Sequence, residues 1–281
     1  MEIAELTESD FPVAGQVLDM AYDGTNLVNA LVKNFSVQPD GWFCARQDGQ
    51  LVGLVGAAHY GHSASIGMVA IHPQAQKQGI GSRLMKRLMV HITEDWRCTS
   101  AFLDATPVGI TLYKSVGFVE TGKTLQLEKG SPAVNTLPSS TRIRSLAAMD
   151  LPGILALDQS VIGGNRQAVF EMLWRNYPSR TFIAENEHGA ITGYVVAQSR
   201  LIGPWVALTP QIAEQLLEKA QTLNFDSTAT VNTPDENLAA LSILDRQGFT
   251  VHRVTHHMLF GNPMDQRDLS RLYGQASFMF G

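Results

Sequence analysis

Short segments of the first half of this chain recur in the second half, in the same order and at a nearly constant spacing. The first match lies 140 positions apart, at residues 3 and 143. The matching pairs are Ile3–Leu6 with Ile143–Leu146, Asp10-Phe11-Pro12 with Asp150-Leu151-Pro152, Phe43-Cys44-Ala45 with Phe182-Ile183-Ala184, Ile66–Ala70 with Ile202–Ala207, and Gly117-Phe118 with Gly248-Phe249. Five ordered matches indicate two copies of one unit, each about 130 residues long.

The pattern within one copy predicts a mixed α/β unit. Turn residues, capping residues and apolar periodicity give the order β, α, β, β, β, α, β, α, β. The expected segments are a strand at Ile3–Leu6, a helix after Ser9-Asp10, hairpin strands at Trp42–Arg46 and Leu51–Ala58, a strand at Gly67–Ile71, an amphipathic helix from Ile80 to Ile92, a strand at Ala101–Asp104, a short helix at Ile110–Ser115 and a last strand after Gly117-Phe118.

The repeat also predicts the domain organisation. We expect an α/β fold with two tandem domains, at residues 1–130 and 142–281. Residues 131–141 contain Pro132, Pro138 and adjacent serines, a composition that is typical of a linker. The apolar residues of the stretch 268–281 predict that it packs as a closing segment.

Composition excludes several classes of protein. With 44% hydrophobic and 17% charged residues, the chain has the composition of a soluble globular protein. Its apolar stretch at Leu51–Ala58 is too short to cross a bilayer, and Met1–Glu5 lacks the features of an export leader. Cys44 and Cys98 are too few for a disulfide framework or a zinc site, so we expect a cytoplasmic protein without a metal. The net charge of −5 argues against nucleic-acid binding.

A glycine-containing segment joins the predicted strand at Gly67–Ile71 to the amphipathic helix. Glycines there let the backbone approach a ligand closely, and the free N–H groups of a helix start suit a phosphate. An ordinary glycine turn is the alternative interpretation. The segment Gln76–Ser82 matches neither a P-loop, because Gly-Lys-Ser/Thr is absent, nor a dinucleotide fingerprint, because Arg83-Leu84 replaces the third glycine.

The context of this segment resembles a known family. The strand Met68–Ile71, the pattern Gln-x-x-Gly-x-Gly and the later segment Leu112–Phe118 are similar to the GNAT superfamily of acyl-CoA-dependent N-acetyltransferases. The resemblance covers residues 3 to about 127 and, more loosely, 143 to about 260. It implies that acetyl-CoA is the co-substrate and that Tyr113 protonates the departing thiolate. The residues that it assigns to coenzyme binding are Val69, Ala70, Ile71, Gln76, Lys77, Gln78, Gly79, Ile80, Gly81 and Ser82.

The second copy keeps the same order of expected strands and helices but lacks the glycine loop and the tyrosine of the first. After Ile202–Leu208 the chain continues with Thr209-Pro210-Gln211, without a glycine loop, and Leu244 stands where the first copy has Tyr113. Asn237 stands seven residues before Leu244, whereas Thr106 takes that place in the first copy, where many GNAT enzymes carry Asn.

An active GNAT half followed by a degenerate one resembles the bacterial family with a YitH-type acetyltransferase domain. The matching stretches are Leu103–Pro107, Gly164-Asn165-Arg166, Ile202-Gly203-Pro204 and His257-Met258. This resemblance implies that the second half completes the acceptor site. A monomer is slightly favoured over a homodimer, since two halves in one chain can replace a dimer.

Other residues have two interpretations each. Asp104 ends a strand beside the expected thioester site and either orients the amine or serves as a turn residue. Arg166 either holds an acidic group of the acceptor or caps a helix, and His72 either ends a strand or acts as a base. Trp42 and Trp205 are expected in the core.

The sequence therefore predicts an acetyl-CoA-dependent N-acetyltransferase. The acetyl group would pass to a primary amine of an unidentified small-molecule or peptide acceptor, by direct transfer in a ternary complex, with Tyr113 and Asp104 as catalytic residues. The alternatives are a non-catalytic acyl-CoA-binding or sensing protein, and a structural adaptor in which both halves are inert.

Overall fold

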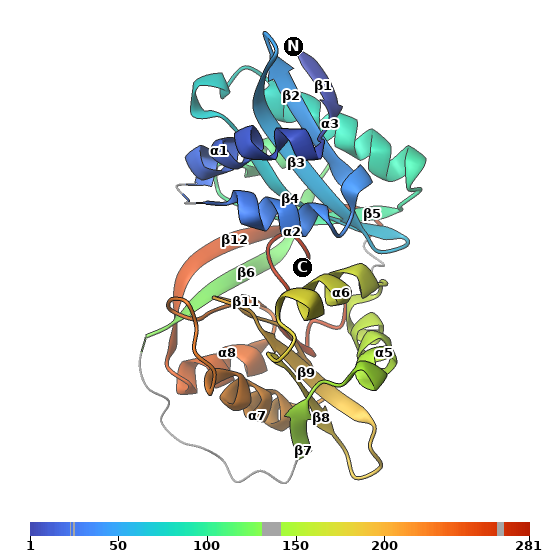
Figure 1. Ribbon diagram of the computed structural model, residues 1–281, viewed down its shortest axis with the longest axis vertical. Helices are drawn as coiled ribbons and strands as arrows, with labels where there is room; N and C mark the ends of the chain where they lie inside the picture. The colour runs from blue at the N-terminus through green and yellow to red at the C-terminus, as the bar shows by residue number, and fades with distance from the viewer. Residues whose placement is uncertain (23, 25, 131–141, 263–266) are drawn as a thin grey trace. The chain divides into compact units, whose positions relative to one another are not determined.

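A computed structural model describes residues 1–22, 24, 26–130, 142–262 and 267–281, and these form two compact units. Unit 1 contains the described residues of Met1–Glu120, residues 258–262 and Phe280. Unit 2 contains the described residues of Thr121–His257, residues 267–279 and Gly281. Figure 1 shows the chain from the N-terminal strand to the C-terminal segment.

Unit 1 is a mixed sheet with helices on both faces. Strands β1 to β4 pair antiparallel in sequence order, and β5 runs parallel to β4. The elements are β1 (Glu2–Glu5), α1 (Phe11–Tyr22), α2 (Val28–Phe35), β2 (Trp42–Gln47), β3 (Gln50–His59), β4 (Ser63–Ile71), α3 (Ile80–Val90), β5 (Ser100–Ala105) and α4 (Ile110–Lys114).

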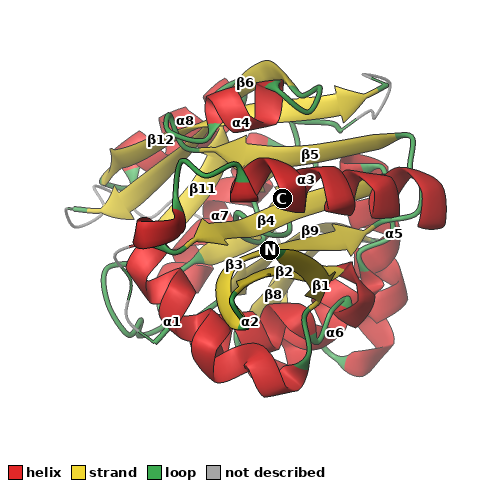
Figure 2. Cartoon of the chain, turned by 90° about the horizontal axis from the view of Figure 1, so that it is seen from above, coloured by secondary structure: helices red, strands yellow, loops and turns green. Residues whose placement is uncertain are grey.

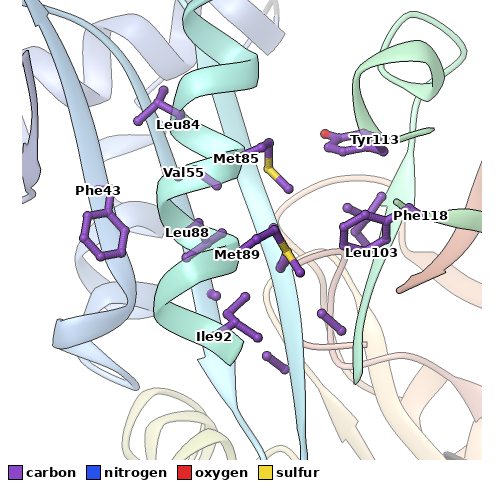
Figure 3. Close-up of a cluster of buried hydrophobic side chains, with 14 of the residues drawn as sticks. Phe43, Val55, Leu84, Met85, Leu88, Met89, Ile92, Leu103, Tyr113 and Phe118 are labelled. Carbon is purple, nitrogen blue, oxygen red and sulfur yellow. The ribbon is translucent and has the colours of Figure 1, made fainter. Parts of the chain in front are cut away.

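Alternation along the strands of unit 1 assigns side chains to the two faces of the sheet. Trp42 points toward Phe35 of α2, with a ring-centroid distance of 6.2 Å. The neighbouring Phe43 belongs instead to the cluster around α3, together with Val55 of β3 (Figure 3). Figure 2 shows α1 and α2 on one side of these strands and α3 on the other. The predicted apolar stripe is therefore confirmed as core, although α3 ends at Val90 and Ile92 lies in the π-helical turn that follows. The buried members of the stripe are Ile80, Leu84, Met85, Leu88, Met89 and Ile92.

Unit 2 repeats this plan. Its sheet has the order β13-β10-β9-β8-β7. The elements of the unit are β7 (Arg142–Ser145), α5 (Leu151–Ile162), α6 (Gln167–Asn176), β8 (Thr181–Glu185), β9 (Ile191–Ala197), β10 (Ile202–Ala207), α7 (Pro210–Gln221), β11 (Thr230–Pro234), α8 (Leu238–Arg246) and β13 (Leu272–Gly274). Trp205 packs with α7 and α8, whereas the next residue, Val206, packs with α5 and α6. Both predicted core tryptophans are fully buried.

The last strand of each repeat belongs in part to the compact unit that the other repeat forms. Strand β6 (Val119–Lys129), which ends the first repeat, lies in unit 2 from Thr121 onward and pairs antiparallel with β11. Strand β12 (Phe249–Gly261), which ends the second repeat, contributes its last residues to unit 1, as a neighbour of β5. The compact units therefore differ from a division of the chain at residue 130, and the boundaries expected from the repeat stay a prediction. The expected linker, 131–141, falls outside the described residues.

Most expected elements are present, and one in each repeat was missed. Helices α2 and α6 follow the first helix of each repeat and are absent from the predicted order. The spacing of Val28, Leu31, Val32 and Phe35 is that of a helix, so a signal for α2 was available in the sequence. The prediction that residues 268–281 pack as a closing segment is confirmed, because Leu272, Tyr273, Met279 and Phe280 are buried.

An aspartate at the start of the first helix carries an ion pair in each unit. Asp10 accepts the backbone N–H of Thr7 and pairs with Arg46 of β2. In unit 2, Asp150 accepts the N–H of Ala147 and both ends of the Arg144 guanidinium, which comes from β7 instead. The hydrogen bonds from Arg144 lower the pKa of Asp150 below 3.8, although burial opposes them. The repeat thus keeps the pair while moving the arginine to the neighbouring strand.

We predict that Asp150→Asn destabilises the protein in a pH-dependent way. Since the folded pKa of Asp150 lies below its unfolded value, the ion pair contributes its full stability above about pH 4 and loses it as the pH falls through the folded value. The variant should lose about 2 kcal/mol at pH 7, and a smaller amount at a pH well below 4, where the wild-type Asp150 carboxylate takes up a proton. Urea unfolding at the two pH values measures this difference. The exposed Asp245→Asn is the control, and an equal loss at both pH values would refute the role of the charge.

Candidate active site

Strands β4 and β5 begin together and then separate. They pair in parallel at Ser63↔Ser100, Ala64↔Ala101 and Ser65↔Phe102, and these two fully described strands have no further pair between them. On its other edge, β4 stays paired with β3 as far as Ile71. Beyond Ser65, the edge of β4 that faces β5 therefore offers backbone N–H and C=O groups that β5 does not use. An extended ligand could pair with such an edge as a strand does.

A bulge lies in this separated part of β4. Met68 has a positive φ of 51°, and the register with β3 shifts between Leu54 and Gly56. Gly67, Met68 and Val69 are partly exposed, whereas Ile66 and Ala70 on either side are buried. The bulge thus brings backbone groups of β4 to the surface, in the segment that contains the predicted coenzyme residues Val69, Ala70 and Ile71.

The loop before α3 presents the start of that helix to solvent. Lys77 and Gly79 have φ angles of 61° and 78°, and Gly79 is the N-cap residue. No side chain caps this helix start, and a Cβ placed on Gly79 would meet nothing within 4 Å. The first N–H groups of α3 therefore have no partner from a preceding turn or a capping side chain. Gln76 to Gly79 are exposed, Gly81 and Ser82 are partly exposed, and the Ile80 side chain is in the core.

The predicted segments meet at the start of α3. A Cβ on Gly81 would lie 3.2 Å from Leu112 of α4 and 3.8 Å from Ile71 at the end of β4. The side-chain amide of Gln76 donates to the carbonyl of Ile71 at 3.2 Å. The loop, the end of β4 and the helix that carries Tyr113 are thus in contact, as the chemistry predicted for them requires.

Tyr113 lies in the hydrophobic cluster of unit 1 (Figure 3). Its side chain is 8% exposed and packs edge-on against Phe118, with a centroid distance of 6.3 Å. Burial raises the pKa of this phenol far above 10, and the nearby Tyr22 phenol raises the pKa further. Tyr113 is consequently a protonated hydrogen-bond donor at any physiological pH. The interpretation of Tyr113 as a core residue is therefore compatible with its interpretation as a proton donor.

Asp104 lies on the opposite face of the sheet from the α3 cluster. Leu103 belongs to that cluster, so the next residue along β5 points the other way, toward the face of α1 and α2. Asp104 is partly buried and has interaction partners of its own. The two predicted catalytic side chains therefore flank the separated strands from opposite faces.

The corresponding place in unit 2 is filled by the chain itself. Leu201, directly before β10, forms a parallel bridge with Thr230 of β11. Beyond it, β13 pairs antiparallel with β10 at Trp205↔Gly274 and Val206↔Leu272. The N–H of Gln275, next to β13, donates to the carbonyl of Asn232 in β11 at 2.8 Å. A protein strand thus uses the backbone edge that is open in unit 1.

The start of α7, the matching helix of unit 2, is capped. Thr209 accepts the N–H of Ile212 at 3.3 Å, and Pro210 has no N–H at the first position of α7. Asn237 accepts the N–H of Ala240 and donates to the carbonyls of Ser270 and Leu272, which holds β13 in place. Leu244, at the position of Tyr113, is fully buried.

Arg166 is part of a buried ion pair of unit 2. Its side chain is fully buried and bonds both oxygens of Asp158 of α5. Arg166 also donates to the backbone oxygen of Gly281 at 2.6 Å. The Tyr194 phenol donates to the Asp158 carboxylate. The interpretation of Arg166 as an acceptor-binding residue is therefore wrong, because every part of the guanidinium is engaged inside the protein.

Two further features of unit 1 are the position of His72 and a groove beside α1. The ring of His72 accepts the N–H of Gln74 at 3.3 Å, which favours its interpretation as a strand-ending residue. A groove of about 430 Å³ lies beside α1, with Val17, Arg46 and His72 in its lining.

Among the residues that the structure describes, no group of three or more His, Cys, Asp or Glu side chains could hold a metal ion.

Both units match models of one protein family. Residues 38–120 match one acetyltransferase (GNAT) domain model, and residues 154–274 match another. The chain therefore belongs to the GNAT acetyltransferase superfamily, a class of acyltransferases, and carries two such domains in tandem. Among the described residues, no helix is long and apolar enough to span a membrane.

Individual relatives agree with this assignment. The chain is 24% identical over 205 residues to a Bacillus subtilis (strain 168) protein named uncharacterized N-acetyltransferase YitH, a match that covers 72% of this chain and 71% of the relative. A crystal structure from Pyrococcus horikoshii superposes with a TM-score of 0.86 at 23% identity, covering 100% of this chain and 95% of that one. A GCN5-related N-acetyltransferase from Anabaena variabilis ATCC 29413 gives 0.65 at 15% identity, covering 92% and 72%. The structural likenesses show a shared fold.

We predict that Arg166→Ala lowers the stability of the protein strongly. The change leaves the Asp158 carboxylate buried without its charge partner, which costs about 3–5 kcal/mol. Urea unfolding of the full chain measures the loss. The control is Arg175→Ala, an exposed arginine in α6, the helix that Arg166 directly precedes. Wild-type stability in the Arg166 variant would show that the buried pair does not act as described.

Proposed function

We propose that this protein transfers the acetyl group of acetyl-CoA directly to a primary amine of a small-molecule or peptide acceptor. The observation that carries this proposal is the contrast between the two units. Unit 1 has separated strands, β4 and β5, beside an uncapped helix start, whereas unit 2 fills both places with its own residues. One acetyl-CoA should therefore bind per chain, in unit 1.

The residues of unit 1 fit the parts of the coenzyme. The amides of the exposed loop from Gln76 to Ser82 would hold the pyrophosphate at the start of α3, where the helix dipole favours negative charge. The open edge of β4 at Val69, Ala70 and Ile71 would pair with the amides of the pantetheine arm. Acetyl-CoA supplies the reactive thioester, and no covalent enzyme intermediate is needed.

The two faces of the sheet separate the chemical roles. Attack by the amine builds negative charge on the carbonyl oxygen, which a fixed backbone N–H of the bulge can stabilise. Asp104, on the face of α1 and α2, would orient the amine or accept its proton. Tyr113, on the α3 side, would donate to the departing sulfur. Transfer would then proceed through the gap between the strands.

The high pKa of Tyr113 is compatible with this role. A phenol whose pKa lies far above 10 gives up its proton less readily than a free one, and a free thiol has a pKa near 8.5. A thiolate that forms at a buried site is destabilised by the same loss of water, so its pKa rises too. Burial therefore keeps Tyr113 protonated without removing the driving force for donation to sulfur.

A non-catalytic acyl-CoA-binding or sensing protein is the second candidate. It shares the coenzyme residues and differs in turnover. An assay of thiol release with a panel of primary amines distinguishes the two, because coenzyme binding without release for any amine would favour the sensor.

We predict that Gly81→Glu abolishes acetyl-CoA binding. The new side chain would press on Leu112 and bring a negative charge to the start of α3, where the pyrophosphate would lie. Titration calorimetry should give one site per chain in the wild type and none in the variant. Gly81→Ala controls for steric effects. Gln211→Glu, at the second position of α7 in unit 2, should leave the stoichiometry and affinity unchanged.

We predict that Tyr113→Phe lowers kcat about 10²-fold and changes the Kd for acetyl-CoA little. The substitution removes the proton donor and keeps the ring that packs against Phe118. Steady-state kinetics with an amine that the wild type acetylates, together with calorimetry, separate the two quantities. Unchanged kcat would remove Tyr113 from the mechanism.

A further inference from the structure

A second phenol of unit 1 reaches the bulge in β4. Tyr22, the last residue of α1, donates its hydroxyl proton to the carbonyl of Val69 at 3.0 Å. This phenol also contributes to the raised pKa of Tyr113, after the larger effect of burial. Tyr22 was not among the candidates that the sequence suggested, since an aromatic residue at a helix end carries no motif.

The bond from Tyr22 fixes one peptide unit of the bulge. Along a strand, the N–H and C=O of one residue point to the same edge, and those of the next residue point to the other edge. The N–H of His72 donates to the carbonyl of Val52, and Ala70 pairs with Leu54 of β3, so Val69 directs its own N–H and C=O to the open edge. Met68, the residue before, has the left-handed φ of 51°, which a methionine seldom adopts. Such a conformation persists where its surroundings hold it. Asn34 of α2 provides a second contact, from its amide nitrogen to the sulfur of Met68 at 3.5 Å.

The exposure of Tyr22 argues against a role in packing alone. Its side chain is 42% exposed, unlike the buried phenols of Tyr113 and Tyr194. An exposed hydroxyl loses little when it bonds water instead of protein, so this bond contributes little to folding. What the bond can determine is the orientation of backbone groups at the separated strands.

We propose that Tyr22 is a positioning residue for acetyl transfer: its hydroxyl bond to Val69 holds the bulge of β4 so that a backbone N–H points at the thioester carbonyl. This inference rests on the proposed function, because it needs acetyl-CoA bound along β4. Tyr22 does not touch the reacting atoms in this account. Its effect passes through the backbone of Val69, whose N–H and carbonyl share the open edge of β4.

The test measures the polarisation of the thioester without any acceptor. Infrared difference spectroscopy records the stretch of acetyl-CoA labelled with heavy carbon at its carbonyl, bound to the full-length wild type and to Tyr22→Phe. In the wild type the stretch should move to lower frequency than in water. In the variant at least about half of that shift should be lost, since the donor is misdirected. Its Kd for acetyl-CoA should stay within about twofold and its Tm within about 3 °C.

Tyr60→Phe, at a buried phenol, is the control. Tyr60 makes the same type of bond in the same unit, from its phenol to the carbonyl of Phe280 at 3.0 Å. Its removal should leave the carbonyl stretch as in the wild type. An unchanged stretch in Tyr22→Phe, with acetyl-CoA bound, would overturn the positioning role and leave the proposed function intact. Absence of acetyl-CoA binding to the wild type would overturn both.

Discussion

The separation of β4 from β5 after Ser65↔Phe102 is the constraint on which the site depends. Within a sheet, each strand satisfies the backbone groups of its neighbour, so two strands that part leave a row of donors and acceptors inside a domain. These groups need another partner. In unit 1 the bulge at Met68, the loop before α3 and the helix with Tyr113 surround this row. The position of each depends on where the strands separate.

Unit 2 meets the same constraint in another way. A parallel bridge joins Leu201, just before β10, to the start of β11. Further along, β13 pairs with the other edge of β10, and the N–H of Gln275 donates to β11. Protein backbone is the natural substitute for a ligand that binds as a strand, because both offer alternating donors and acceptors. The two units thus share one fold, and the partner of one backbone edge distinguishes them. This difference supports a single coenzyme site more directly than the loss of any one side chain.

Local signals in the sequence predicted much of unit 1. The stripe of α3, the hairpin β2–β3 and the glycine loop each depend on residues close together in the chain, and each is present. What sequence reasoning missed depends on distant partners. Strand β13 has three residues, which is too short for an apolar periodicity to predict it. It is defined by its pairing with β10. Arg166 looked like a cap or an anion anchor, since its partner Asp158 lies on another helix and nothing in the sequence pairs them. Tyr22 is a third case, because its bond spans 47 positions.

Asn237 shows that a side chain resembling a motif residue can have a structural role. The second repeat has Asn at this position, whereas the first repeat has Thr106. In unit 2 its side chain caps α8 and bonds two carbonyls beside and within β13. Both tasks are structural, and both need an acceptor and a donor on one short side chain, which asparagine provides and threonine does not provide in the same geometry. The contacts with β13 and its neighbour Ser270 therefore give Asn237 a structural role. A motif residue is thus informative about function only together with the partner that it binds.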